Sequence, residues 1–318
     1  MRHVFILNPC AGKKQPALAL REKIEHYFDS YGGEYSIRLT DGVGAATRIA
    51  HEECAKGDAV RLYACGGDGT LHEVANGILP YSHAELTVIP CGSGNDYVRI
   101  FGGNEPFLDL PSLIEGVAMP VDAVECDGRL SLNIAAIGMD AKVAAKMIRY
   151  KHLPGVSGSL AYNLAIVDVI CHRIGDEMEI VIEGENGRVE RKGYYLFALA
   201  ANGQYYGGGY RGAPQAIEDD GVLDFVLVKK IPRLEILSFL KLYKAGHYAH
   251  LACCEHIRGS AMTVRSKKAA YCTVDGECTC SSNMSFSILP RAFNFVVPSA
   301  VAEARATKNG RDGWLLCK

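Results

Sequence analysis

The segment Gly66–Thr70, with the sequence Gly-Gly-Asp-Gly-Thr, places glycines and a carboxylate directly after the apolar run Val60–Ala64. Glycines let backbone N–H groups approach an anion closely, and the start of a helix favours negative charge. Asp68 beside a phosphate would be repulsive without a cation, so the loop predicts a phosphate site with Mg²⁺. A plain strand-to-helix turn explains part of the pattern, because Thr70 and Glu73 have the spacing of a capping box.

A second loop of this kind, Gly92–Asp96, follows the apolar run Leu86–Pro90. In an open α/β sheet, ligands bind beyond the carboxyl ends of the strands. Two glycine-rich loops after successive strands, each with an aspartate, therefore predict one nucleotide site. The chain has no Walker A spacing, no GxGxxG after its first strand and no protein-kinase catalytic loop, which argues against those classes.

Two acidic segments stand in the second half of the chain, Asp219–Asp224 and Val274–Glu277. A carboxylate within hydrogen-bond reach of a hydroxyl can act as a general base. Asp-Gly is also a strong turn signal, so each segment could be a turn between strands. From the residues alone, the turn is the better explanation of Val274–Glu277, and both alternatives stay open.

The first 120 residues alternate strands with helices, which predicts βαβ units and a mostly parallel sheet. The tail also holds an apolar strand, Phe293–Val297. The expected strands are Val4–Leu7, Tyr35–Leu39, Val60–Ala64 and Leu86–Pro90, and the expected helices are Pro16–Tyr31, Ala45–Lys56 and Leu71–Gly77.

From about residue 121 the pattern changes to short strands separated by turns, with Glu185–Arg188 as a hairpin turn. This predicts an antiparallel sheet or sandwich under a few helices. The last of these helices, Arg233–Ala252, could face a membrane or cover the sheet, and covering the sheet is favoured. The other expected elements are strands Met178–Glu183, Tyr194–Ala201, Leu223–Val228, Met262–Val264, Ala270–Asp275 and Met284–Leu289, and helices Ala141–Tyr150 and Leu160–His172.

The 318 residues are 48% hydrophobic and carry a net charge of −2, values that exclude a disordered chain and a general electrostatic footprint for nucleic acid. No run of about 18 apolar residues is present, so a transmembrane helix is not expected. The 12 cysteines are expected as free thiols in a reducing cytoplasm. Three of them lie in or beside predicted nucleotide loops, where modification of the thiol could block nucleotide binding. Cys65 and Cys91 directly precede the two glycine-rich loops, and Cys10 lies in the segment Asn8–Gly12.

Taken together and in chain order, these motifs resemble the soluble lipid kinases with a diacylglycerol-kinase catalytic domain. That group includes bacterial diacylglycerol kinases and sphingosine kinases. The matching segments cover nearly the whole chain and are Asn8–Gly12, Gly66–Thr70 with Glu73 and Asn76–Gly77, Gly92–Asp96, Asn133–Gly138, Asn202–Gly203 with Gly207–Gly209, Asp219–Asp224 and Val274–Glu277.

The resemblance implies two domains and an ATP-dependent kinase that phosphorylates a lipid hydroxyl. Residues 1–122 plus 293–318 would form an α/β nucleotide domain with a parallel sheet like those of phosphofructokinase and NAD kinase. Residues 123–292 would form a β-rich sandwich for the lipid. The family analogy implies peripheral contact of a cytoplasmic enzyme with a membrane surface, no nucleic acid, and a possible homodimer.

The resemblance also implies roles for single residues. Asp275, Glu277 and Asp68 would be catalytic, and one of the first two would be the general base. Asp68 and Asp96 would organise catalytic Mg²⁺, while a structural Mg²⁺ would take the Asp220 side chain and the carbonyls of Ile217 and Val222. The nucleotide site would comprise Asn8, Pro9, Gly12, Thr40, Gly66, Gly67, Asp68, Gly69, Thr70, Glu73, Ser93, Asn95 and Asp96.

Two other functions remain as alternatives. An NAD kinase-like enzyme would also carry a Gly-Gly-Asp-Gly-Thr loop, although Gly92–Asp96 and the Gly207–Asp224 region fit that family poorly. A catalytically silent nucleotide-binding regulator would bind ATP without turnover, and the presence of Asp68, Asp96, Asp275 and Glu277 argues against it. The sequence does not identify the lipid, because apolar specificity pockets leave no motif.

Overall fold

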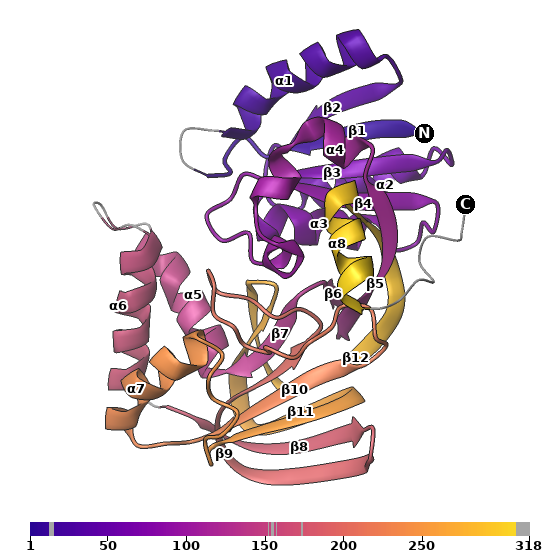
Figure 1. Cartoon of the computed structure of the whole chain (residues 1–318). Helices are drawn as coiled ribbons and strands as arrows, with labels where there is room; N and C mark the ends of the chain where they lie inside the picture. Colours follow the sequence, from indigo (N-terminus) through magenta and orange to yellow (C-terminus); the bar gives the residue numbers. More distant parts are fainter. Residues whose placement is uncertain (13–15, 152, 154–155, 157, 173, 310–318) are drawn as a thin grey trace. The chain divides into compact units, whose positions relative to one another are not determined.

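The computed structural model describes residues 1–12, 16–151, 153, 156, 158–172 and 174–309 (Figure 1). The chain divides into two compact units, Met1–Val121 with Arg291–Lys318, and Asp122–Pro290. Strands β5 (Val117–Cys126) and β12 (Glu277–Val297) have residues in both. The domains 1–122 plus 293–318 and 123–292, as independently folding parts, stay a prediction, and 310–318 lie outside the described residues.

The first unit is built on a parallel sheet, which confirms the predicted α/β class. Strand β1 (Arg2–Leu7) pairs in parallel with β2 (Tyr35–Leu39) and β3 (Val60–Gly66), and β3 pairs with β4 (Ala84–Pro90). The end of β12 then pairs in parallel with β4. Every residue of β1 and β3 is buried, as expected for strands covered on both faces.

Helices α1 (Pro16–Tyr31), α2 (Ala45–Cys54) and α3 (Asp68–Ile78) follow the first three strands, as predicted. A Cβ on Gly77 of α3 would collide with the Thr47 carbonyl of α2, so this glycine lets the two helices pack closely. Sequence patterns did not predict α8 (Ser299–Asn309), because its polar composition carries no apolar stripe. The unit also contains α4 (Leu110–Ile114) and the 3₁₀ helices η1 (Tyr97–Phe101) and η2 (Glu105–Leu108).

The second unit is rich in antiparallel strands and confirms the predicted β-sandwich class. Strand β9 (Gly187–Ala201) pairs antiparallel with β7, β8 and β10. Strand β11 (Cys254–Val274) pairs antiparallel with β7, β8, β10 and β12, so β9 and β11 are its long central strands. The remaining bounds are β6 (Arg129–Ser131), β7 (Ile134–Gly138), β8 (Asp176–Gly184) and β10 (Leu223–Lys229).

Four of the predicted strands form only two strands in the structure, because each of two neighbouring pairs is continuous. Met262–Val264 and residues 270–274 of the predicted strand Ala270–Asp275 both belong to β11, which continues through a register shift between Arg265 and Ala270 and ends at Val274, one residue before Asp275. Met284–Leu289 and Phe293–Val297 both belong to β12. A 21-residue strand is much longer than usual, so the polar residues within it resemble turns between shorter strands.

Three helices of the second unit, α5 (Met139–Lys151), α6 (Gly158–Cys171) and α7 (Arg233–Lys244), share one apolar cluster with β7, β9 and β10. Helix α7 ends at Lys244 and not at Ala252, because Gly246 takes a left-handed φ of 77° and His247 N–H returns to the Leu242 carbonyl. No helix among the described residues is long and apolar enough to cross a membrane.

Candidate functional site

The two glycine-rich loops of the first unit touch backbone to backbone. The Cys91 N–H donates to the Gly66 carbonyl at 2.8 Å, where β3 and β4 end. A Cβ on Gly92 would lie 2.5 Å from the Gly67 Cα, and a Cβ on Gly66 would collide with the Thr70 side chain. Close approach of the two loops therefore requires Gly92, while Gly66 leaves room for the Thr70 side chain of its own loop.

The carboxylate of Asp68 ties the first loop to the second. Its Oδ1 accepts the N–H of Asp96 at 2.7 Å and that of Tyr97 at 3.3 Å, at the start of η1. Asn95 closes its own loop, because its side chain both accepts from Gly92 N–H at 3.1 Å and donates to the Gly92 carbonyl at 3.0 Å. Asp68 and Asn95 thus fix the loop geometry.

The segment after β1 joins the same edge of the sheet. The Asn8 side chain donates to Thr70 Oγ1 at 3.0 Å and accepts the Cys10 N–H at 3.0 Å. The Thr40 N–H, directly after β2, bonds the Leu7 carbonyl at 2.9 Å. Gly12 adopts a left-handed φ of 69°.

The first unit thus collects the predicted nucleotide residues beyond the carboxyl ends of four parallel strands, where open α/β sheets bind ligands. Ser93 is exposed and Pro9 is half-buried. The residues at this edge are Asn8, Pro9, Gly12, Thr40, Gly66, Gly67, Asp68, Gly69, Thr70, Ser93, Asn95 and Asp96.

Glu73 has a different partner from the one its spacing predicts. The expected capping box with Thr70 is wrong, since the N-cap of α3 is Gly67 and has no side-chain cap. The Glu73 carboxylate instead accepts the N–H groups of Gly44 and Ala46, both at 3.0 Å, at the start of α2. Because the α2 N-cap is a glycine, Glu73 supplies the cap that this helix lacks.

The site fits a magnesium ion at Asp68 and Asp96. A Cβ on Gly94 would lie 2.7 Å from Asp68 Oδ2 and 3.7 Å from Asp96 Oδ2, so both oxygens face the space above this glycine. Arg99 donates to Asp96 Oδ1 at 3.0 Å and orients that carboxylate. Carboxylate oxygens are the ligands Mg²⁺ prefers, and it also takes phosphate oxygens. Among the described residues, no three His, Cys, Asp or Glu side chains could hold a metal ion.

In the second unit, Asp275 acts as a clamp on a neighbouring turn. Its Oδ1 accepts Ser131 Oγ at 2.6 Å and Ile134 N–H at 3.2 Å, and its Oδ2 accepts Leu132 N–H at 3.0 Å. Asp275 itself has a left-handed φ of 46°, and Gly276 follows it in the turn that joins β11 to β12. The predicted hairpin turn is therefore confirmed.

Glu277, two residues on, differs in its surroundings. Its side chain is 44% exposed, and Arg129 lies 3.9 Å away across an ion pair. The oxygens of Asp275 accept hydrogen bonds from two backbone N–H groups and the Ser131 hydroxyl, whereas the Glu277 carboxylate is 44% exposed to solvent. The two members of the predicted acidic pair are thus chemically distinct.

The Asp220 turn does not fit the predicted structural magnesium site. Asp220 Oδ1 accepts the Val222 N–H at 3.2 Å, and Oδ2 is bonded by the Arg258 guanidinium. The neighbouring Gly221 N–H is held by Asp122 Oδ2 at 2.7 Å, while Ile217 is exposed. Each oxygen of the Asp220 carboxylate thus has a protein donor, and the donor to Oδ2 is itself a cation that repels a metal ion.

One candidate residue escaped the sequence analysis. Asp140, at the start of α5, borders a cavity of about 20 Å³ between α5, α6, α7 and β9. Its Oδ1 accepts the Ala141 N–H at 2.8 Å, while Oδ2 is buried and the carboxyl group interacts with the Tyr206 hydroxyl. Burial raises the pKa of Asp140 to about 6.

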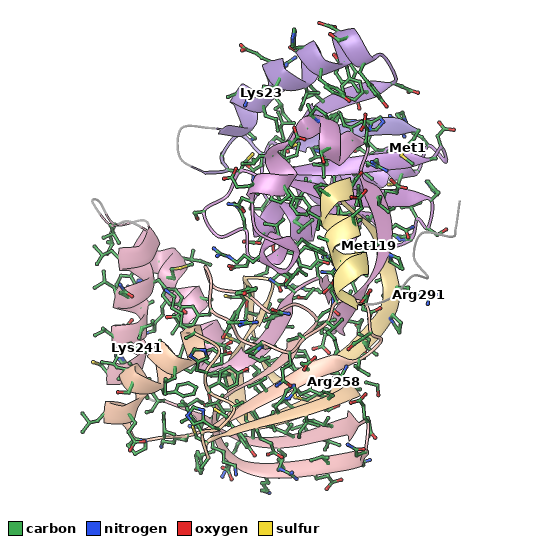
Figure 2. The ribbon with its side chains drawn as sticks, in the orientation of Figure 1. Met1, Lys23, Met119, Lys241, Arg258 and Arg291 are labelled. Atoms are coloured by element: carbon green, nitrogen blue, oxygen red, sulfur yellow. The ribbon has the colours of Figure 1, made fainter. Side chains whose placement is uncertain are left out.

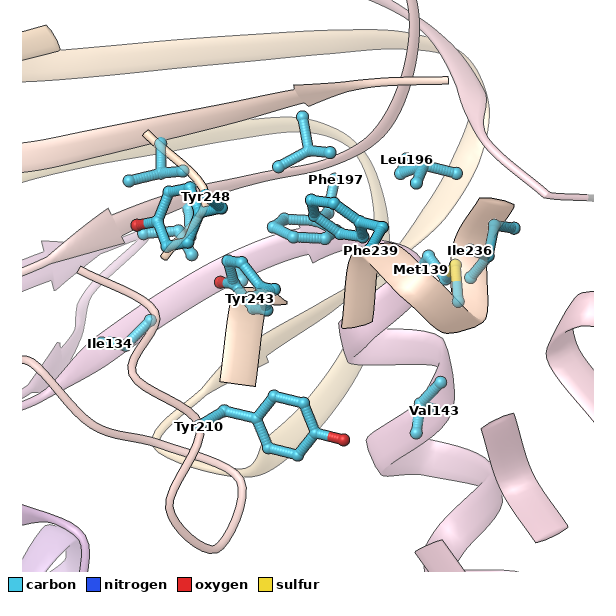
Figure 3. Packing of buried hydrophobic residues seen from close by; sticks show 14 of the residues in the cluster. Ile134, Met139, Val143, Leu196, Phe197, Tyr210, Ile236, Phe239, Tyr243 and Tyr248 are labelled. Atoms are coloured by element: carbon cyan, nitrogen blue, oxygen red, sulfur yellow. The ribbon is translucent and has the colours of Figure 1, made fainter. Parts of the chain in front are cut away.

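The rest of this cavity wall is apolar and aromatic, and Figure 3 shows how its rings pack. The ring centres of Phe197 and Phe239 lie 5.2 and 5.4 Å from the ring centre of Tyr243. The hydroxyl oxygens of Tyr243 and Tyr206 are 3.1 Å apart. An apolar wall leaves no motif, but an aspartate two residues after the buried strand β7 is a usable signal for Asp140. The lining residues are Met139, Val143, Tyr162, Ile166, Leu196, Phe197, Tyr206, Tyr210, Ile236, Phe239, Leu240 and Tyr243.

Comparison with known proteins matches this architecture along nearly the whole chain. The family model described as "Diacylglycerol kinase catalytic domain" covers residues 2–126, and the one described as "YegS C-terminal NAD kinase beta sandwich-like domain" covers residues 133–297. The chain belongs to the diacylglycerol kinase and YegS-like family of lipid kinases. The family resemblance of the motifs is therefore confirmed.

Two curated relatives illustrate the similarity. A protein of Bacillus subtilis (strain 168) named "Diacylglycerol kinase" is 28% identical over 302 residues, which cover 94% of this chain and 97% of the relative. A "Probable lipid kinase YegS-like" protein of Pseudomonas aeruginosa is 31% identical over 275 residues, covering 84% and 86%.

Solved structures share the fold. A diacylglycerol kinase structure from Bacillus anthracis str. Sterne aligns with a TM-score of 0.69 at 21% identity, covering 94% of this chain and 98% of the other. A second structure from that organism aligns with a TM-score of 0.73 at 24% identity and the same coverage. At these identities the likeness establishes the fold alone.

Proposed function

We propose that the protein is an ATP-dependent kinase that phosphorylates a hydroxyl group of diacylglycerol or a related lipid, such as a sphingoid base. The observation that carries this proposal is the junction of the two glycine-rich loops, where Asp68 holds the second loop and two carboxylates face the space above Gly94. Membership in the lipid kinase family supports the same reaction class.

The first unit would bind ATP at this junction. Nothing lies within 4 Å of a Cβ built on Gly69, so the first turn of α3 is open to a phosphate, and its N–H groups favour an anion. Asn8, Thr40 and Ser93 would contact the nucleotide from the neighbouring strand ends. Asp68 and Asp96 would hold Mg²⁺, which neutralises phosphate charge when bound.

Within this proposal Glu277 is the general base and Asp275 is a positioning residue. The lipid hydroxyl attacks the terminal phosphorus, the bond to the ADP oxygen breaks, and the hydroxyl proton passes to the Glu277 carboxylate. Its exposed carboxylate supports this role, because proton transfer requires an oxygen with room for a substrate. Asp275 is already occupied by three donors of the 131–134 segment.

The second unit would receive the lipid. Its cavity combines an apolar wall with one carboxyl group, the surroundings that suit a lipid carrying a hydroxyl. A cavity of about 20 Å³ admits only a water-sized guest, so a lipid chain requires the α5–α7 layer to separate. Asp140 would then orient the polar end of the lipid.

Contact with a membrane surface is part of the proposal. Helix α7 covers the sheet with Ile236, Phe239 and Tyr243, as the sequence favoured, yet it exposes 94% of Leu234 and 62% of Leu237. Helices α5, α6 and α7 carry seven Lys and Arg residues against three Asp and Glu, in a chain whose net charge is −2. Exposed leucines and basic charge suit peripheral binding of a cytoplasmic enzyme to anionic lipid.

A mass-spectrometric screen of extracted bacterial lipids incubated with the protein, ATP and Mg²⁺ tests the proposal. The expected product is a lipid heavier by one phosphate group. Formation of NADP from NAD would favour the NAD kinase-like alternative instead. Tight ATP binding with no phosphorylated lipid of any class would favour the silent regulator. Light scattering checks the homodimer expected from the family.

A further inference from the structure

Arg258 stands on β11 in the second unit, opposite Asp224 in the register of β10 and β11 (Figure 2). Its guanidinium bonds Asp220 Oδ2 through Nη2, while Nη1 lies 3.7 Å from Glu185 Oε2. Asp220 is only 14% exposed. The arginine therefore places a positive charge directly on Oδ2 of this largely buried carboxylate.

The turn needs positive charge because it gathers carboxylates. Asp122, Asp224 and Glu218 are each no more than 3% exposed. His256 bonds Asp224, which leaves Arg258 as the cation that contacts Asp220 among the described residues.

Arginine suits this task for physical reasons. The guanidinium is charged at every accessible pH and presents donors in a rigid fork that matches a carboxylate. A charge-assisted hydrogen bond from arginine is among the stronger polar contacts in proteins. Unlike a metal ion, it is covalently part of the chain and cannot dissociate.

We infer that Arg258 replaces the structural Mg²⁺ that the family pattern implies at Ile217, Asp220 and Val222, so that the second unit holds its acidic turn without a divalent cation. The inference does not rest on the kinase proposal. The catalytic cation would be held by Asp68 and Asp96 in the first unit, and a failure at one site leaves the other unaffected.

The test compares thermal unfolding and Mn²⁺ binding of the full chain with Arg258→Gln, Asp220→Asn and the matched control Arg265→Gln. Arg265 lies on the same strand, is exposed and is far in sequence from the turn. The wild type and Asp220→Asn should show the same rise of the unfolding midpoint on adding Mg²⁺. Arg258→Gln should unfold about 2–6 °C lower in EDTA.

Adding Mn²⁺ should then raise the unfolding midpoint of Arg258→Gln part of the way back to that of the wild type. Equilibrium titration should find one more Mn²⁺ bound per chain in Arg258→Gln than in the wild type or Arg265→Gln. The inference is overturned if Asp220→Asn loses part of the Mg²⁺ response of the wild type, because a cation then binds Asp220 beside Arg258. It is also overturned if Arg258→Gln binds no additional ion. Should that variant not fold, the wild type and Asp220→Asn still decide the question.

Discussion

Asp68 in the first unit and Asp275 in the second do the same structural work with different consequences. Each accepts backbone N–H groups from a second segment, Asp68 from Asp96 and Tyr97, and Asp275 from Leu132 and Ile134. Asp68 uses Oδ1 for this and turns Oδ2 with Asp96 over Gly94, whereas Asp275 commits both oxygens. Asp68 thus directs one oxygen toward the space beside Asp96, whereas Asp275 uses both of its oxygens to hold the 131–134 segment.

The largest mutational effect is expected at Glu277 and Asp275, which test whether an aspartate bonded on both oxygens is structural and the exposed glutamate is catalytic. Glu277→Gln should lower kcat for lipid phosphorylation by about 10²–10⁴-fold with an unchanged unfolding midpoint, because the amide cannot accept the proton. Asp275→Asn should lower the free energy of unfolding by about 1–3 kcal/mol, because its amide N–H₂ would face backbone donors.

Steady-state kinetics and denaturant unfolding of both variants check this division of roles. Isothermal titration with ATP supplies the control, since neither change lies in the first unit. If Glu277→Gln keeps full activity while Asp275→Asn stays fully stable, the assignment of base and clamp is contradicted.

The glycine-rich loops offer the next contrast. Gly92→Ala would place a Cβ 2.5 Å from Gly67 Cα and should cost about 1–3 kcal/mol of stability as the loops separate. Gly69→Ala meets nothing within 4 Å and should unfold like the wild type. It should nevertheless bind ATP more weakly, because the open space at Gly69 is where a phosphate would approach.

Thermal unfolding and ATP titration of the two variants form a matched pair. Equal stability losses would show that the close approach of Gly67 and Gly92 carries no special cost. Unchanged ATP affinity in Gly69→Ala would remove the phosphate from the first turn of α3.

Asp140 supplies a pH-dependent prediction. Its pKa of about 6 in the folded chain exceeds the ordinary value of 3.8, so the folded state binds more protons between pH 4 and 6 than the unfolded state does. Stability from this group is therefore present below pH 4 and lost as pH rises through 6. Between pH 4 and 7, the free energy of unfolding of Asp140→Asn should therefore rise relative to that of the wild type by up to about 3 kcal/mol.

Urea unfolding at a series of pH values measures this difference, with Asp41→Asn, a change at a 79% exposed carboxylate, as the control. A constant difference between Asp140→Asn and the wild type over this range would mean that the cavity does not bury a titrating carboxyl group.

The smallest expected effect concerns the thiols beside the loops. Burial raises the pKa of Cys65 far above its usual range and that of Cys91 to about 11, whereas Cys10 is exposed. Maleimide should therefore modify Cys10 before the other two, and saturating ATP should slow that reaction without slowing modification of the exposed Cys171. No protection of Cys10 would place ATP away from the Asn8–Gly12 segment.

Much of this architecture was predictable because local signals and tertiary structure agree. The strands Tyr35–Leu39 and Val60–Ala64 and the hairpin turn at Glu185–Arg188 lie where apolar runs and turn residues placed them. The glycine-rich loops were visible because a backbone that must approach an anion or another backbone tolerates no side chain. Such positions leave a compositional trace.

Other features depend on contacts between distant segments and leave no local trace. Glu73 bonds the start of α2, and Arg258 bonds Asp220, across tens of positions in the sequence. Asp140 is buried because several helices enclose it. The spacing of Thr70 and Glu73 predicts a capping box within α3, which is wrong. The Glu73 carboxylate instead caps the start of α2, whose N-cap residue is a glycine without a capping side chain.

The most direct test of lipid kinase activity follows the γ-phosphate of radiolabelled ATP. The protein, Mg²⁺ and lipid vesicles containing diacylglycerol or long-chain bases are incubated, and lipids are separated from nucleotide. The account predicts a labelled phospholipid that forms with the wild type and falls by at least about 10²-fold with Glu277→Gln. No labelled lipid from any class, or equal labelling by both proteins, would contradict it.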